Sequence, residues 1–167
     1  ISTHLWFDTQ AKEAAQFYTS TFKDCKIKDT TELENTPSGS VDIVTMEIYG
    51  QKFTLLSAGP LFKINPSVSF LIACNSKEEV DELWGKLSVG GMALMELGQY
   101  PFSEKYGWIQ DRYGVSWQIM FMGGFELKQK VIPTMMFVGD VCGKAEEAMN
   151  FYVSIFHDAK VGEILRY

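Results

Sequence analysis

The residues able to do chemistry in this 167-residue sequence are few and widely spaced. Its two histidines, His4 and His157, lie far apart, and its three cysteines show neither a CxxC motif nor the Cys/His spacing of zinc sites. Ser57 and Ser69 have no histidine or lysine at a spacing that indicates a nucleophilic serine. No two of the candidate acids share a spacing typical of an acid/base pair: Glu47, Glu96, Glu104 and Asp111. Local motifs therefore indicate no particular reaction.

His4 lies in a predicted strand, and we interpret it as a histidine hydrogen-bonded within that strand, with metal ligation as the alternative. His157 falls at a predicted helix C-terminus, where a positive charge meets the helix dipole. The glycine pairs Gly90–Gly91 and Gly123–Gly124 match no phosphate-binding motif and predict turns. A group of aromatic residues and flexible methionines remains. Each member alone is more simply interpreted as a core residue, but together they favour an apolar pocket. The group consists of Trp6, Phe102, Tyr106, Trp108, Trp117, Met46, Met95 and Met120.

Composition narrows the functions further. The formal net charge is −6 without a Lys/Arg cluster, so the sequence predicts no binding to nucleic acid or to an anionic membrane surface. The sequence contains no uninterrupted run of about 18 apolar residues, so it predicts no membrane-spanning helix. The number of cysteines is odd, and we interpret Cys25, Cys74 and Cys142 as free thiols. Free thiols are typical of a reducing compartment, so we expect a cytoplasmic protein. Hydrophobic residues make up 46% of the chain, which is enough to form the core of one domain.

The elements that must position these residues form two similar halves. In the first, a strand (3–7) leads into a helix (11–22) and strands near 26–33, 41–49 and 52–57. In the second, the strand VSFLIAC precedes a helix that opens with Ser76 and Glu79, a capping box, and strands near 92–96, 106–110 and 115–121 follow. The order is twice strand, helix, three strands. The sequence thus predicts an α+β fold of paired βαβββ modules that form a cupped mixed sheet.

The end of the chain repeats its beginning. AKEAAQFYTSTFKDCKIKDTTEL from residue 11 and AEEAMNFYVSIFHDAKVGEILRY from residue 145 align without a gap, and nine positions are identical. The strands 3–7 and 133–137 also correspond, although the second copy has four extra residues within 138–144. Such self-similarity indicates a duplicated unit. We expect a first domain at 1–122, a linker at 123–130, and at 131–167 the first βαβ part of a second domain, truncated or docked on its own first domain or another subunit.

Three segments, LWFDTQAKEAAQFYTSTF, SFLIACNSKEEVDELWGKLSVGG and EKYGWIQDRYGVSWQIM, resemble the glyoxalase/bleomycin-resistance/dioxygenase (vicinal oxygen chelate) superfamily. More narrowly they resemble its PhnB-like branch, which carries the 3-demethylubiquinone-9 3-methyltransferase domain label. The resemblance covers residues 3–121, resumes at 132, and implies the paired modules above. In its register Gln118 faces the cleft, and Trp117 packs against the helices.

Metal-dependent members of that superfamily take mostly His and Glu ligands from the first and last strands of the modules. At the corresponding positions this sequence has Ser69, Gln118 and either Leu56 or Ser57, so only His4 resembles a ligand, and we expect neither a tightly held metal nor another cofactor. We expect these residues to contact a small molecule: His4, Trp6, Ser57, Ser69, Phe102, Trp108 and Gln118.

The resemblance and the aromatic set together favour a protein that binds a small, partly apolar molecule in the cleft. One alternative is a lyase, isomerase or dioxygenase-type enzyme that recruits a divalent ion. A second is the methyltransferase of the family label, which the lack of a glycine-rich adenosine loop disfavours. A third is a pure assembly unit. We expect a homodimer or pairing of the tail with another module.

Overall fold

The computed structural model describes residues 2–37, 39–124 and 129–166. The chain divides into two compact units, residues 1–134 and 135–167, and each is treated by itself. Within the described ranges no helix has the length and apolar character needed to cross a bilayer.

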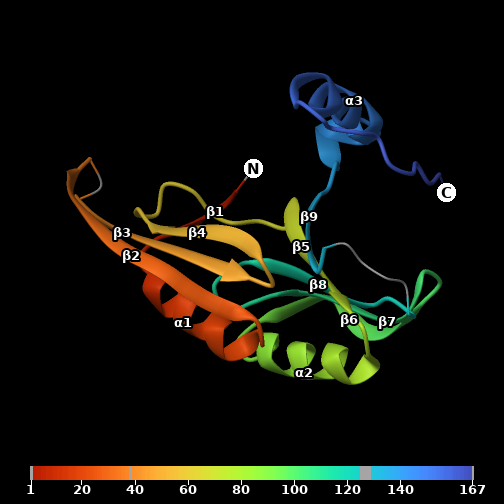
Figure 1. Cartoon of the computed structure of the whole chain (residues 1–167), viewed down its shortest axis with the longest axis horizontal. Coiled ribbons are helices and arrows are strands. Elements are labelled where there is room, and N and C mark those ends of the chain that lie inside the picture. Colours follow the sequence, from red (N-terminus) through yellow and green to blue (C-terminus); the bar gives the residue numbers. More distant parts are fainter. Residues whose placement is uncertain (1, 38, 125–128, 167) are drawn as a thin grey trace. The chain divides into compact units, whose positions relative to one another are not determined.

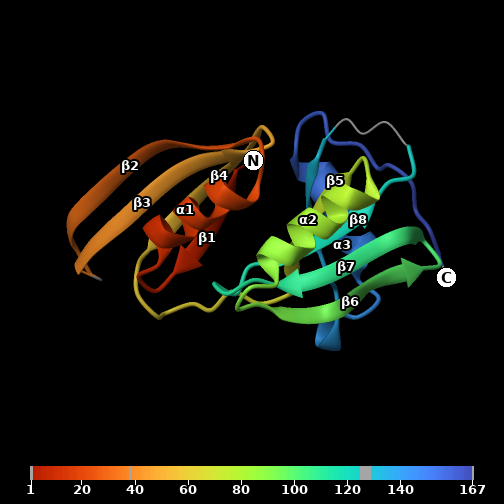
Figure 2. The ribbon, with the colours of Figure 1, turned by 90° about the horizontal axis from the view of Figure 1, so that it is seen from below.

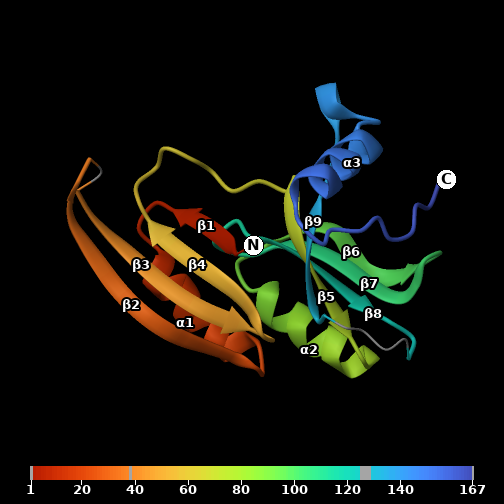
Figure 3. The same cartoon turned by 45° about the horizontal axis from the view of Figure 1, so that its top comes forward.

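The first module of unit 1 is a four-stranded sheet, sheet A, covered by one helix. Its elements are β1 (Thr3–Phe7), α1 (Ala11–Thr21), β2 (Cys25–Thr36), β3 (Gly39–Ile48) and β4 (Gln51–Ser57). The strand order is β1-β4-β3-β2, in which β1 runs parallel to β4 and the other pairs are antiparallel. In Figure 3, β2 lies on the far side of sheet A from the second module, and β1 lies on the near side.

The second module repeats this plan with sheet B. It contains β5 (Val68–Cys74), α2 (Lys77–Leu87), β6 (Met92–Tyr100), β7 (Ser103–Gln110) and β8 (Ser116–Phe121). The strand order is β6-β7-β8-β5-β9, and β5 is parallel to β8 as β1 is to β4. The fifth strand, β9 (Val131–Met135), was expected to open the second domain, yet it extends sheet B along the edge of β5 that the module's own strands leave unpaired. The compact unit therefore continues to residue 134.

Both helices cover the same side of the two sheets, so each sheet has a helix face and an open face (Figures 1 and 2). Strand alternation places Leu55, Trp117 and Ile119 on the helix face, where all are fully buried. Trp117 lies at the centre of one core shared by both modules, with ring centroids 5.0 Å from Phe22 and 5.3 Å from Phe70. The predicted α+β pair of βαβββ modules is confirmed.

The helix α2 begins as the sequence predicts. The hydroxyl oxygen of Ser76 accepts a hydrogen bond from the Glu79 backbone N–H at 3.2 Å, and the Glu79 carboxylate accepts one from the Asn75 N–H at 3.0 Å. These two bonds satisfy two donors at the helix start, although the Glu79 carboxylate bonds the residue before the N-cap and not Ser76 itself. The Glu79 carboxylate also pairs with Lys130, whose backbone carbonyl accepts from the Ala73 N–H, and this helps to hold β9 on β5.

Unit 2 contains a 3-10 turn (Gly139–Val141) and the helix α3 (Ala145–Ile155), which repeats α1 in local geometry. Each helix has 11 residues, and each ends where the backbone N–H of a phenylalanine, Phe22 or Phe156, bonds the carbonyl of the tyrosine four residues before it. The residues that precede them, Gln10 and Lys144, also adopt similar backbone angles. The duplicated sequence therefore folds twice into the same helix.

Unit 2 differs from the first copy in two ways. The strand predicted after the helix is absent, because residues 157–166 form no strand and find no partner equivalent to β3 in their unit. The apolar stripe of α3 is open: Phe151 is 58% exposed and Phe156 is 44% exposed. In the first copy the corresponding helix packs against β3 and β4, and α3 has no such strands within its unit.

Candidate functional site

The open face of sheet B carries a row of hydrogen-bonded polar side chains. Tyr106 and Gln118 lie on neighbouring strands, and the Tyr106 hydroxyl donates to Gln118 Oε1 at 2.7 Å. Gln118 Nε2 in turn donates to the Ser69 hydroxyl oxygen at 2.7 Å. Burial raises the pKa of Tyr106 to about 12. The sequence prediction that Gln118 faces away from the helices and Trp117 toward them agrees with this arrangement.

Trp108 lies on the same face, beside Gln118 in the β7–β8 ladder. Its indole Nε1–H donates to the Ser116 hydroxyl oxygen at 2.7 Å. The aromatic ring is only partly buried. Ser69, Trp108 and Gln118, three of the predicted ligand contacts, are thus brought together on one face of one sheet.

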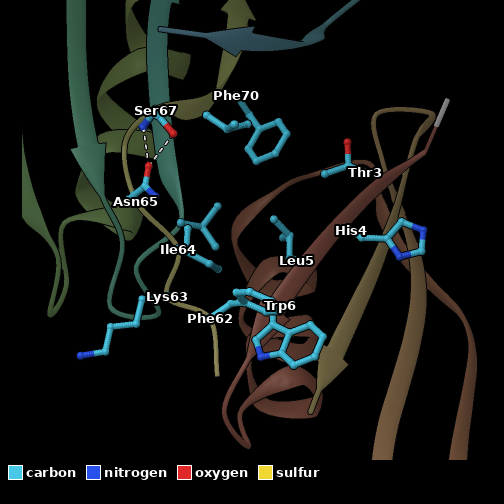
Figure 4. Close-up of a pocket in the computed structure, with 12 residues that line it drawn as sticks. Thr3, His4, Leu5, Trp6, Phe62, Lys63, Ile64, Asn65, Ser67 and Phe70 are labelled. Carbon is cyan, nitrogen blue, oxygen red and sulfur yellow. Dashed lines mark hydrogen bonds between the residues drawn. The ribbon is translucent and has the colours of Figure 1, made fainter. Parts of the chain in front are cut away.

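A cavity of about 240 Å³ runs beside β1, between that strand and residues 62–70. Figure 4 shows Leu5, Ile64 and Phe70 directed toward a common space, whereas the His4 ring points away from it. The exposed lining is mainly apolar, and it also includes Trp6, Phe62, Val68 and Val115. Within sheet A, β1 pairs only with β4, so backbone groups along its other edge remain available to a ligand.

The loop 59–64 contributes Phe62, Lys63 and Ile64 to the wall of this cavity. Gly59 has a φ of +86°, which favours glycine, and its carbonyl accepts a 2.8 Å hydrogen bond from Trp6 Nε1. Trp6 then packs edge to face with Phe62 at a centroid distance of 5.0 Å. Phe62 nevertheless remains 60% exposed, and its neighbour Leu61 is 76% exposed. Apolar side chains so exposed beside a cavity are typical of a binding surface.

The polar groups at this cavity come from its two ends. Asn65 Oδ1 accepts hydrogen bonds from the backbone N–H and the hydroxyl of Ser67 (Figure 4), which fixes the orientation of the Asn65 side chain. Its amide N–H groups form no hydrogen bond with any residue that the structure describes, and the Thr3 hydroxyl forms none within the same ranges. Both therefore remain free to bond a guest.

The seven predicted contacts do not form one cluster. His4 and Trp6 belong to the cavity beside β1, although the His4 ring is directed elsewhere. Phe102 lies in the β6–β7 turn, stacked on Tyr100 at 5.6 Å, beside a separate cavity of about 290 Å³. Ser57 is on the helix face, where its buried hydroxyl oxygen accepts a 2.9 Å hydrogen bond from the Ala11 backbone N–H at the start of α1.

The segment from Phe62 to Ser67 was missed as a site by sequence reasoning. The available signal was a pair of apolar residues, Leu61 and Phe62, in a loop that starts and ends near prolines. Asp111, counted among candidate acids near the cleft, is buried on the helix side instead. Its carboxylate accepts from four donors, and its burial raises its pKa.

The donor set does not fit the metal site that the superfamily implies. Of the corresponding residues, Ser69 and Gln118 bond one another, Ser57 faces the helices, and His4 stands on sheet A. Amide and hydroxyl oxygens with one imidazole are weak ligands for a transition metal. Among the residues with described positions, no three His, Cys, Asp or Glu side chains are arranged to hold a metal ion.

Comparisons with known proteins agree with this architecture. The family model of 3-demethylubiquinone-9 3-methyltransferase matches residues 1–120. A putative 3-demethylubiquinone-9 3-methyltransferase, the PhnB protein of Bacillus cereus, is 38% identical with a TM-score of 0.67 over 72% of this chain and 98% of its own. A comparison with curated proteins gave no match.

Two more distant structures show the fold alone. A Pseudomonas aeruginosa protein is 21% identical with a TM-score of 0.63, covering 72% of this chain and 96% of its own. A glyoxalase family protein from Bacillus cereus is 13% identical with a TM-score of 0.52, covering 72% of this chain and 91% of its own. The family model and the 38% identical PhnB protein are decisive: the chain belongs to the 3-demethylubiquinone-9 3-methyltransferase family and is PhnB-like.

Proposed function

We propose that this protein binds a small, partly apolar molecule in the cavity beside β1, without a tightly held metal. The observation that carries the proposal is the cavity itself, about 240 Å³ with walls of Leu5, Trp6, Ile64 and Phe70. Small-molecule sites are largely apolar clefts of about 300–1,000 Å³ with few polar anchors, and this cavity lies just below that range. A guest about the size of one or two aromatic rings is what it favours.

The polar groups around the cavity give such a guest an orientation. Thr3 and Asn65 offer hydrogen-bond partners at the cavity, and the free edge of β1 adds backbone groups. An apolar guest with one or two carbonyl or hydroxyl groups would satisfy both its apolar and its polar surfaces there. The proposal retains Trp6 from the predicted contacts and does not use Ser57 or Phe102.

Methyl transfer, which the family description names, is not the function that these observations favour. The two strand-to-helix connections of unit 1 are residues 8–10 and 75–76, and neither contains a glycine. Glycine-rich turns at that position let the backbone approach an adenosine cofactor closely. We therefore propose binding in preference to methyl transfer.

The test is a thermal-shift screen with neutral one- and two-ring aromatic compounds, followed by calorimetry. Binding at 100 times Kd should stabilise the fold by about 2.7 kcal/mol. The variant Ile64→Trp fills the cavity and should abolish the shift. The matched control is Leu61→Trp, at an exposed position outside the lining, which should keep it. Equal binding by both variants, or no hit with the unaltered protein, would contradict the proposal.

Calorimetry with zinc, nickel and manganese separates this proposal from the metal-assisted alternative. We expect no tight one-to-one site, because Gln118 and Ser69 supply only an amide and a hydroxyl. Tight stoichiometric binding that Gln118→Leu abolishes would overturn the metal-free proposal in favour of a metal-assisted enzyme.

A further inference from the structure

A second cavity, of about 280 Å³, adjoins the first. The two share Trp6, Phe62, Lys63 and Ile64 as a common wall. The second cavity is completed by the turn after β1 and by the β7–β8 turn, which contributes Arg112. A guest that extends past Phe62 therefore leaves the apolar cavity and enters a different chemical environment.

Two cations line this second cavity: Arg112, and Lys63, which it shares with the first. The Lys63 side chain extends away from Thr3 and His4 (Figure 4), and within residues 2–37, 39–124 and 129–166 its ammonium group forms no ion pair. The Arg112 guanidinium lies over the Phe17 ring at 4.7 Å, and its Nε–H donates to the Val89 carbonyl at 3.0 Å. These contacts hold the guanidinium plane, while its terminal N–H groups form no hydrogen bond with a described residue. A fixed guanidinium fork suits an oxyanion.

The lining of the second cavity contains one acidic residue. Asp8 lies on the wall of the second cavity, and Glu13, which does not line it, accepts a 2.8 Å hydrogen bond from the Tyr113 hydroxyl. The lining thus contains two cationic residues, Lys63 and Arg112, and one acidic residue, Asp8. The protein as a whole carries a formal net charge of −6, so it repels anions generally, and only a local cation pair can select one.

We propose that the two cavities form one bipartite site for an amphipathic organic anion. The apolar body of the ligand occupies the cavity beside β1, and its carboxylate, sulfonate or phosphonate group reaches Lys63 and Arg112. The inference rests on the proposed function for its apolar half. The inference adds that the ligand is negatively charged and that Lys63 and Arg112 bind its charged group.

The experiment compares 2-naphthoate with 2-naphthamide, two probes of nearly the same shape that differ in charge. Calorimetry on the full chain should give 2-naphthoate an affinity about tenfold or more higher, because charge-assisted hydrogen bonds exceed neutral ones. The advantage should shrink as salt is raised, while the affinity for 2-naphthamide stays constant. Acetate, which lacks the apolar body, should bind neither measurably nor competitively.

Variants assign the effect to the two cations. Lys63→Gln combined with Arg112→Gln should lower the affinity for 2-naphthoate to that for 2-naphthamide and leave the latter unchanged. The control Lys52→Gln removes an exposed charge outside both cavities and should change neither. An unchanged melting temperature of the double variant shows that it is folded; if that variant unfolds, the two single variants carry the same test.

The outcomes separate the two proposals. If 2-naphthamide binds in a manner that Ile64→Trp abolishes, yet 2-naphthoate binds no tighter, the cation pair is not part of the site and only the bipartite proposal fails. If acetate displaces 2-naphthoate with an affinity equal to that of 2-naphthoate, the second cavity is a general anion site and the bipartite proposal also fails. If neither probe binds, both proposals fail together.

Discussion

The Tyr18 hydroxyl donates a 2.8 Å hydrogen bond to Asp111 Oδ2, and this bond joins α1 of the first module to the end of β7 in the second. The same carboxylate oxygen accepts from Trp117 Nε1 at 2.8 Å, and Oδ1 accepts from the backbone N–H groups of Tyr113 and Val115. Four donors surround one buried carboxylate. Since the β7–β8 turn also contributes Arg112 to the second cavity, this bond ties the position of that cavity to the core.

Removing the Tyr18 hydroxyl should therefore cost stability at the seam between the modules. Tyr18→Phe keeps the ring but takes one donor from a buried carboxylate, and we expect the free energy of unfolding to fall by about 1–3 kcal/mol. Urea denaturation measures it. The control Tyr113→Phe removes a hydroxyl that bonds the exposed Glu13, and it should stay within about 0.5 kcal/mol of the unaltered protein. Equal losses for the two variants would contradict this account.

The fold should lose stability at alkaline pH. Burial raises the pKa of Tyr106 from 10.0 to about 12, and the pKa values of Tyr49 and Tyr113 move in the same direction. Since the unfolded chain releases these protons first, the stability they contribute is complete below pH 10 and is lost as the pH rises toward about 12. Urea denaturation from pH 9 to pH 12 should show the decline, and Tyr106→Phe should decline less steeply. A slope unchanged by that substitution would exclude Tyr106 as a contributor.

The alternation of side chains along the strands was the basis for most of the fold features that the sequence predicts. Alternation in β8 is enough to assign Trp117 and Gln118 to opposite faces, because a strand leaves only two choices. The bond from Tyr18 to Asp111 spans 93 positions, and no local pattern encodes it. One wall of the first cavity comes from residues 62–67, which belong to a loop without periodicity whose path depends on Gly59 and on the Trp6 contact. Trp6 lies in a strand that the sequence pattern predicts, so it could be proposed as a contact. Phe62 and Ile64 lie in the loop, so they could not.

Two glycines of the second module should respond to alanine in opposite ways. A Cβ atom at Gly107 would lie 2.5 Å from the Trp84 ring, so we expect Gly107→Ala to destabilise the fold by about 1–3 kcal/mol. Gly85 is inside α2, and beyond its chain neighbours and the backbone of its own helix no atom lies within 4 Å of the added carbon, so alanine there should stabilise the helix by up to about 1 kcal/mol. Thermal unfolding of both variants checks the pair. A stable Gly107→Ala variant would show that α2 can move away from β7.

The repeated helix predicts unequal responses at equivalent positions. Phe22 and Phe156 close α1 and α3 with the same backbone geometry, but Phe22 is 2% exposed and Phe156 is 44% exposed. Phe22→Ala should therefore lower the free energy of unfolding of unit 1 by about 3–5 kcal/mol, because it leaves a cavity beside Trp117. Phe156→Ala removes a side chain that unit 2 does not enclose, so the same urea transition should stay within about 0.5 kcal/mol of that of the unaltered protein. A large loss from Phe156→Ala would mean that α3 is covered in solution, and the uncovered stripe would then belong to an interface.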